Sequence, residues 1–477
     1  MVTDKFRSQL RQEAAQWQTE ELIEEQFYDQ LATRYEFDKL ESSARNRFTM
    51  ILLSIGGLLL GLGILTFVAA NWQGWGREVR LILLLSVFIA VNAIGFHLWQ
   101  RGRNPWQSLL GQALLFTGAL SLGANMALMA QMFQIGGAEY KLFLVWGVGV
   151  LIMAYSLRLT LLGMLAIALI GIGYWAGLYQ SLYEFTNYDT SLWRWVISLM
   201  PLIATVAYLP LAYWCRSRWI FVSSIIAVIS SLLSLIDSSG WFFYWNNSPH
   251  QSIWGLISLI LPPALLWSYD DFPWRRSSEE PEIFAAIARK LSLLLIINSC
   301  FFLSFYAAWT WSSSGNFRNY SYDIWIILLS VILFTIWTVA QWIKHSKLSL
   351  QPPYFQLDLT STFVLSLLGI MSITTIWHNH VSLIPILGTF IFNCLLFILG
   401  IGLTREGLTG NDRLSFWLGM GLLTAQIFSR TFEYDTGLLL KSLILILCGA
   451  GVMIAGIWFE RHLRHQGLVS VSNRPPT

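Results

Sequence analysis

The residue types in this chain that could carry chemistry are few, and the histidine pair is the first of them. His378 and His380 form a His-Asn-His sequence, and two imidazoles at this spacing can bind one metal ion. No acidic residue or cysteine lies near them in the sequence to act as a third ligand. They are candidate metal ligands at most, and we predict that they lie in an interfacial loop.

Neutral amides inside long apolar segments form the second group. An amide in such a segment usually hydrogen-bonds to a neighbouring helix and contributes about 0.6–2 kcal/mol. The alternative is that these amides line a polar cavity for a neutral or zwitterionic group. The candidates are Asn71 and the adjacent Trp72, Asn92, Gln112, Asn125 and Gln131, and the same pattern holds for Asn298, Asn393 and Gln426.

Charged residues give no sign of catalysis or ion coupling. No Asp, Glu, Lys or Arg lies near the middle of an apolar segment, although proton- and ion-coupled pumps usually need such a group. Glu433 and Asp435, beside Arg430, are expected to form a solvated loop with local pairing. No Walker motif, nucleophile elbow, HExxH motif or dinucleotide fingerprint is present. We therefore expect no enzymatic activity and no cofactor.

Composition decides the class of protein. Hydrophobic residues make up 55% of the 477 positions and charged residues 12%, whereas a soluble domain has about a quarter charged residues. In lipid, a helix satisfies its own backbone hydrogen bonds. The sequence therefore predicts an all-α, polytopic transmembrane bundle whose partner is the lipid bilayer and not a nucleic acid.

The apolar segments indicate about fourteen membrane spans. A run of about 20 apolar residues crosses a roughly 30 Å hydrocarbon layer as a helix, and residues 48–70 contain no charge. Only Arg158 separates two of the runs. The expected spans are 48–70, 79–99, 107–131, 141–157, 159–179, 192–213, 219–236, 252–269, 287–309, 323–343, 357–377, 383–403, 414–430 and 438–459.

This threading predicts the arrangement of domains and ends. Spans one to eight occupy residues 48–269, a cytoplasmic linker follows at 270–286, and spans nine to fourteen occupy 287–459. Most of the 30 Lys and Arg residues then fall on the side of the N-terminus, and an excess of such residues marks the cytoplasmic side. We expect both termini in the cytoplasm, with a disordered tail over 460–477.

The first 47 residues predict two short amphipathic helices outside the membrane. Trp17 lies on an apolar face of the first, and Ile23, Phe27 and Leu31 recur at helical spacing in the second. Thr19 is expected as the N-cap between them. The simplest interpretation is a cytosolic helical hairpin that packs on the membrane domain. The alternative is that residues 1–44 dock a cytosolic partner protein.

Four patterns in the first third of the chain resemble those of a known family. They are Trp17, the Leu-Ile to Tyr stretch at 22–28, the glycine-rich span that ends in Ala-Ala-Asn-Trp at 69–72, and the Met-Ala-Gln to Gly-Gly stretch at 129–137. An aromatic segment from Phe143 to Trp146 follows.

Over about residues 8–180, the chain is similar to the bacterial predicted membrane protein family called domain of unknown function 2157. The resemblance implies the bacterial plasma membrane and no established activity or catalytic residue. Gln134 stands where the family pattern has histidine, which argues against a metal or proton role there.

Three functions are compatible with these observations. The first is a carrier or flippase for a lipid-linked or uncharged solute. The second is a membrane scaffold or sensor that docks a partner through the N-terminal helices. The third is a membrane-embedded glycan polymerase or ligase, which would need charged residues clustered in a large outer loop. The number of spans and the neutral amides favour the first, whereas the short, weakly charged outer loops argue against the third.

Overall fold

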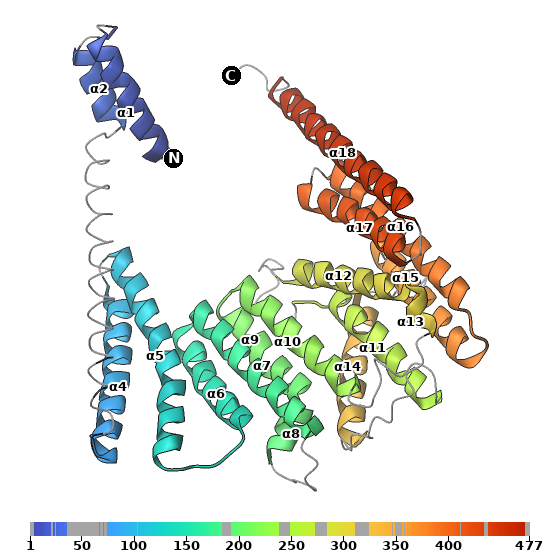
Figure 1. Ribbon diagram of the computed structural model, residues 1–477, viewed down its shortest axis with the longest axis horizontal. Helices are drawn as coiled ribbons and strands as arrows, with labels where there is room; N and C mark the ends of the chain where they lie inside the picture. Colours follow the sequence, from blue (N-terminus) through green and yellow to red (C-terminus); the bar gives the residue numbers. More distant parts are fainter. Residues whose placement is uncertain are drawn as a thin grey trace. The chain divides into compact units, whose positions relative to one another are not determined.

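The computed structural model shows an almost entirely helical chain that divides into two compact units, residues 1–93 and residues 94–477 (Figure 1). Its described residues are 4–20, 22–23, 25–35, 66, 70, 74–102, 104–183, 192–237, 249–271, 284–310, 324–345, 347–348, 355–356, 358–410, 412–433 and 437–472.

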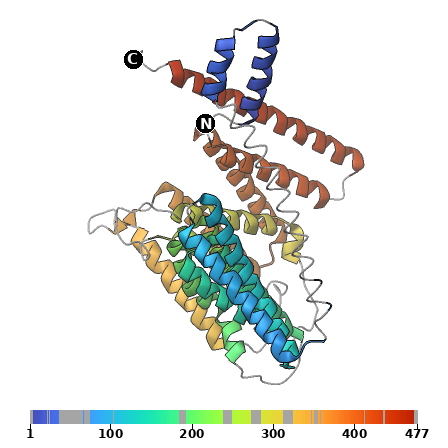
Figure 2. The ribbon, with the colours of Figure 1, turned by 90° about the vertical axis from the view of Figure 1, so that its left-hand side faces the viewer.

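The first unit contains a helical hairpin. Helices α1 (Asp4–Thr19) and α2 (Glu25–Tyr35) lie side by side (Figures 1 and 2). The two short helices predicted from the sequence are therefore present, but Thr19 does not cap the second. Its hydroxyl donates to the carbonyls of Ala15 and Gln16, so it is the last residue of α1. A threonine hydroxyl can bond back to the preceding turn in this way.

The remaining elements follow in chain order. The first group is α4 (Arg77–Arg101), which crosses the boundary between the units, α5 (Pro105–Met132), α6 (Glu139–Leu157), α7 (Thr160–Tyr183), α8 (Leu192–Ser198), α9 (Met200–Trp214), α10 (Arg218–Asp237) and α11 (Pro249–Trp267). The second group is α12 (Ala285–Leu303), α13 (Tyr306–Thr310), α14 (Ile324–His345), β1 (Lys347–Leu348), β2 (Phe355–Gln356), α15 (Leu359–His380), α16 (Pro385–Thr409), α17 (Arg413–Glu433) and α18 (Leu438–Ser472). The two strands pair antiparallel between α14 and α15.

The fold class predicted from the sequence is confirmed. Among the described residues, 10 helices are long and apolar enough to cross a membrane, or 11 if α8 and α9 count as one bent span. Every expected segment after the first coincides with a helix. Helix α17 is less apolar than these, and the apolar part of α11 is short, Trp254–Trp267. The expected first span, 48–70, lies almost wholly outside the described residues.

Three expected boundaries are corrected. The segment 192–213 is bent by 69° between α8 and α9. Pro201 stands in the first turn of α9, where its ring cannot follow a helix that continues from α8. The segment 287–309 is interrupted between α12 and α13. Helix α18 continues to Ser472, so the tail expected to be disordered from 460 is helical to that residue.

Two apolar cores fill the second unit. The first is formed mainly by α6, α7, α9 and α10, and the second by α12, α15 and α16. Helix α11 belongs to both, because Leu265 and Leu266 face the first core while Ala264 and Trp267 face the second. Helix α12 also belongs to both, with Ala288 in the first core and Ile296 in the second, so the two cores are joined through shared helices.

Glycines allow the closest helix contacts. Helices α6 and α7 pack along their length (Figure 1), and Gly173 and Gly177 of α7 lie directly against Leu144 and Tyr140 of α6. This Gly-xxx-Gly pair therefore lets the two helices approach closely. The corresponding pair in the first span, Gly57 and Gly61, lies outside the described residues.

Replacement of Gly173 by alanine should destabilise the protein. The new Cβ would lie 2.9 Å from Cγ of Leu144 and 3.0 Å from its backbone nitrogen, which is overpacking of the kind that costs roughly 1–3 kcal/mol. Gly171, on the same helix, has no atom within 4 Å of an added Cβ. Thermal unfolding in detergent should show a lower midpoint for Gly173→Ala and no loss for Gly171→Ala. Equal midpoints would contradict this account of the α6–α7 contact.

Candidate functional site

The interruption between α12 and α13 exposes polar backbone in a part of the chain that is otherwise apolar. Helix α12 ends at Leu303 and α13 begins at Tyr306. The N–H of Ser304 still donates to the carbonyl of Cys300, but the carbonyl of Ser304 and the N–H of Tyr306 bond to side chains of other helices. No proline or glycine lies near this point to explain the break. In a membrane protein, non-helical backbone must be satisfied by other protein groups or by water, and side chains of other helices supply them here.

An ion pair from the last turn of α17 satisfies both sides of the break. Nη1 of Arg430 donates to the carbonyl oxygen of Ser304 at 2.6 Å, and its guanidinium lies 4.2 Å from the ring centre of Phe305. Oε1 of Glu433 accepts a hydrogen bond from the backbone N–H of Tyr306 at 2.6 Å. The two side chains also pair with each other. Each charge thus satisfies the backbone group of the opposite polarity.

Two neutral amides extend the network to α16. Nδ2 of Asn393 donates to the carbonyl of Ser304 at 3.0 Å, and Nε2 of Gln426 donates to the backbone carbonyl of Asn393 at 2.7 Å. The cross-helix hydrogen bonds predicted for apolar-segment amides are therefore observed at Asn393 and Gln426. We call Ser304, Asn393, Gln426, Arg430 and Glu433 the break cluster.

The break cluster differs from the sequence-based expectation for its charged members. Arg430 and Glu433 were expected in a solvated loop, but they lie on α17 with side chains only 16% and 14% exposed. Their local pairing was foreseen, whereas their burial was not. Asp435 lies outside the described residues. A paired charge this well buried stabilises little by itself, but removal of one partner leaves the other uncompensated.

The histidine pair lies on α15 and not in a loop. His378 is 3% exposed, its Nδ1 accepts from the N–H of Ile384, and its ring meets Trp309 of α13 edge to face at 4.9 Å. Nε1 of Trp309 donates to the carbonyl of Leu303, the end of α12. His380 is exposed. The described residues contain no group of three metal-ligating side chains. His378 therefore packs beside the break.

The amides of α5 do not form one site. Gln112 and Gln131 lie about 28 Å apart along the helix axis at 1.5 Å per residue. Asn125 is buried, while Gln131 is exposed and Gln112 is half-buried. Asn92 belongs to the other unit, and its Nδ2 donates to Phe88 in its own helix. Asn71 and Trp72 lie outside the described residues.

The candidate docking residues of the N-terminal hairpin differ in exposure. Trp17, Ile23 and Leu31 are half-buried, and Phe27 is 50% exposed. Leu22 is 67% exposed, although it is not among the predicted docking residues. The hairpin thus presents two large apolar side chains on its surface.

A second polar cluster, missed in the sequence, joins α11 to α12. Asp271 is fully buried, and its Oδ2 accepts from the N–H groups of Phe284 and Ala285 at the start of α12. Its Oδ1 accepts from the hydroxyl of Tyr213, which also bonds to Tyr269 at 2.8 Å. Tyr269 is itself buried, and its phenol belongs to the same hydrogen-bond network.

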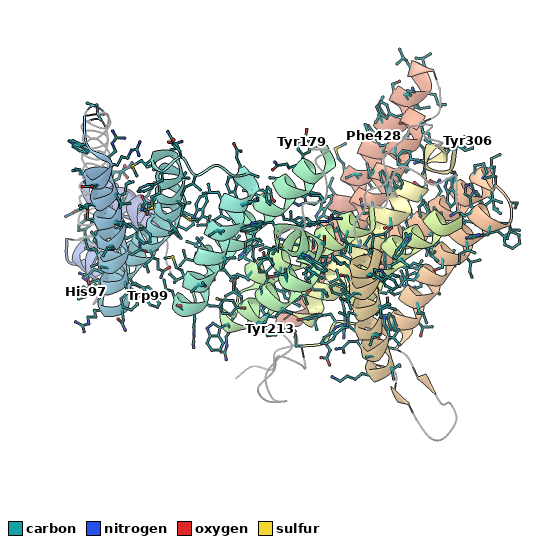
Figure 3. The ribbon with its side chains drawn as sticks, turned by 90° about the horizontal axis from the view of Figure 1, so that it is seen from below. His97, Trp99, Tyr179, Tyr213, Tyr306 and Phe428 are labelled. Carbon is teal, nitrogen blue, oxygen red and sulfur yellow. The ribbon has the colours of Figure 1, made fainter. Side chains whose placement is uncertain are left out.

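This second cluster serves as a structural cap, because a carboxylate stabilises the positive end of α12. Figure 3 shows Tyr213 toward one edge of the second unit, and Tyr306 and Phe428 toward the opposite edge. The break cluster and the α11–α12 connection therefore lie at opposite ends of the helices.

The aromatic segment from Phe143 to Trp146, one of the sequence patterns, forms part of the contact between α5 and α6. Nε1 of Trp146 donates to the carbonyl of Ala119 at 2.8 Å, and its ring covers Gly123 so closely that a Cβ there would lie 2.3 Å away. Phe143 stacks on the same indole. Gln134 lies near the start of the connection from α5 to α6 and adopts a left-handed conformation, with φ 52°.

These elements fall within a recognised sequence family. Residues 15–163 match the family described as Predicted membrane protein (DUF2157). The match runs from α1 into α7 and includes the Gly123–Trp146 contact, whereas the break cluster lies beyond it. No curated protein and no solved structure shows significant similarity to the chain. The resemblance seen in the sequence is confirmed over these residues, and the chain is a predicted integral membrane protein.

The ion pair of the break cluster can be tested by a double-mutant cycle. Arg430→Met or Glu433→Leu alone leaves one charge uncompensated, which costs up to about 3–5 kcal/mol for a buried pair. The double substitution removes both charges and should cost less than the sum. Thermal or chemical unfolding of the purified protein measures the coupling.

Arg405→Met provides the matched control, because Arg405 is an exposed arginine on the adjacent α16. Its effect should stay within about 0.5 kcal/mol, as for most surface substitutions. Additive losses for Arg430→Met and Glu433→Leu would show that the pair does not act as a unit.

Proposed function

We propose that this membrane protein is a carrier or flippase for a lipid-linked or uncharged polar solute. The observation that supports the proposal is the interruption between α12 and α13. There the ion pair and amides of the break cluster hydrogen-bond to backbone groups of Ser304 and Tyr306. Many transporters bind their solute where a discontinuous helix meets polar side chains. The proposal assigns no enzymatic step to the chain.

The chemistry of the break cluster favours a solute without net charge. Arg430 and Glu433 neutralise each other, so the cluster offers no excess charge to an ion. Oε1 of Gln426 and Oγ1 of Thr389, one turn before Asn393, are buried atoms with no hydrogen-bond partner among the described residues. An amide oxygen and a hydroxyl suit the hydroxyl groups of a neutral headgroup.

The bent span formed by α8 and α9 adds support. Helices α8 and α9, in the other core, meet at 69°, and helices α11 and α12 connect the two cores. A carrier needs two parts that can move relative to each other around a polar site. Two cores joined through shared helices, each with an interrupted span, provide such parts.

Docking of a partner protein is the second candidate. It is favoured by the exposed Leu22 and Phe27 of the α1–α2 hairpin. Deletion of residues 1–44 should abolish co-purification of the partner and leave membrane insertion intact. Retained co-purification would remove the docking hypothesis without affecting the carrier.

We further propose that the chain lies in the bacterial plasma membrane with both ends in the cytoplasm. The distribution of basic residues supports this orientation. The ends of the described helices agree with it, because Tyr179 and Tyr306 point to one edge of the second unit and Tyr213 to the other (Figure 3).

A deletion strain should accumulate the transported compound. Lipid and metabolite profiles of the strain should show one neutral or lipid-linked species that returns to its normal level with the wild-type chain. Complementation by Gln426→Leu should fail although the protein is present in the membrane, because the solute loses an amide partner. Gly171→Ala serves as the control that complements. An unchanged profile in the deletion strain would contradict the carrier proposal.

Labelling of native cysteines should report the orientation. Cys215 directly follows α9, and burial raises the pKa of its thiol, although nearby Arg158 acts in the opposite direction. Only the thiolate reacts, so labelling by an impermeant maleimide should increase as the pH rises above about 8.5, the pKa of a free cysteine. We expect it only from the cytoplasmic side, in inverted vesicles. Labelling in intact cells would reverse the proposed threading.

A further inference from the structure

Two arginines at one end of the helices adopt a backbone conformation that usually belongs to glycine. Arg158 ends α6 with φ 55°, and Arg216, just after α9, has φ 48°. Among the described residues, Gln134 is the only other non-glycine with a positive φ. Residues with a Cβ are strained there, and glycine is usual at a helix C-terminus of this kind. Backbone geometry alone favours glycine at both positions, so the arginine side chains must have another role there.

The guanidinium of Arg158 stacks on an aromatic platform, the indole ring of Trp214. It lies 4.3 Å from the ring centre of Trp214, the last residue of α9. Nε1 of Trp214 donates to the carbonyl of Tyr155 at 3.2 Å, and the hydroxyl of Tyr155 donates to Ala207 at 2.6 Å. Stacking on an aromatic face leaves the N–H groups at the edge of a guanidinium available to a ligand. Arg158 is exposed.

Two helices begin beside this platform. Helix α7 begins at Thr160 and α10 at Arg218, and they are in contact near these ends, because a Cβ on Gly163 would lie 2.7 Å from Ile220. Helix N-termini are electropositive and bind phosphate groups. Arg218 adds a third exposed guanidinium, and the next side chain, Trp219, is 70% exposed.

We propose that Arg158, Arg216 and Arg218, with Trp214 and Trp219, form a site for the phosphate of an anionic phospholipid headgroup. We call this set the arginine corner. Guanidinium groups bind phosphate in a bidentate manner, and the two N-termini add to the positive field. The exposed Trp219 at the end of a membrane helix is suited to the headgroup layer. These aromatic and apolar surroundings assign the phosphate to a lipid and not to a soluble anion.

Native mass spectrometry of the full-length protein in detergent tests the site with two probes, palmitoyl-oleoyl phosphatidylglycerol and palmitoyl-oleoyl phosphatidylcholine. The wild type should prefer the anionic lipid by about tenfold or more. Arg158→Gly/Arg216→Gly removes two charges and keeps the backbone that glycine favours. Its lipid preference should fall close to one, with no loss in thermal midpoint.

Arg405→Gln is the matched control, since Arg405 is an exposed arginine near the end of α16. This variant should retain the preference. If the glycine pair does not fold, Arg158→Gln/Arg218→Gln is measured in the same way. An unchanged preference in the folded corner variant would overturn the proposal.

Inorganic phosphate separates the two sources of the anion. At equal concentration it should leave the thermal midpoint of the wild type unchanged, whereas phosphatidylglycerol should raise it. Equal stabilisation by both would show a site for soluble phosphate and would overturn the assignment to lipid.

Discussion

The second unit depends on the satisfaction of backbone polar groups where helices stop inside an apolar protein. A continuous helix meets this requirement by itself, but an interrupted one does not. The chain solves the problem at Ser304 with a full set of side-chain donors and acceptors from other helices, among them Arg430, Asn393 and Glu433. It solves the same problem at the start of α12 with the buried carboxylate of Asp271. Almost all of the charge in the described interior serves these two breaks.

The two cores rely on different kinds of contact between helices. The first core relies on small residues, with Gly123 beneath Trp146 and Gly173 against Leu144. The second core carries the larger share of cross-helix polar contacts. In lipid, helix association gains little from the hydrophobic effect, so both devices are needed to hold helices together. Of the two cores, the family match reaches only the first, through α5, α6 and the start of α7, and the break cluster belongs to the part of the chain that the match does not reach.

The sequence predicts the helices well because the apolar period of a membrane span is a strong local signal. Arg158 alone between two runs is enough to place the boundary of α6 and α7. Pro201 is a local signal for the bend after Leu199, but it lies within a run of apolar residues that predicts one continuous span. The break at Ser304 has none, because Arg430 is more than a hundred residues away in the chain and only tertiary contact brings it there. Burial of Asp271 is hidden for the same reason.

One oxygen atom at the break has a consequence for movement. The carbonyl of Ser304 accepts from both Arg430 and Asn393, and a carbonyl oxygen has two lone pairs. Its capacity is therefore full at rest. A further hydroxyl could bond to that oxygen only in place of the hydrogen bond from Arg430 or the one from Asn393. Occupancy of this oxygen and loss of a link between helices would therefore be a single event.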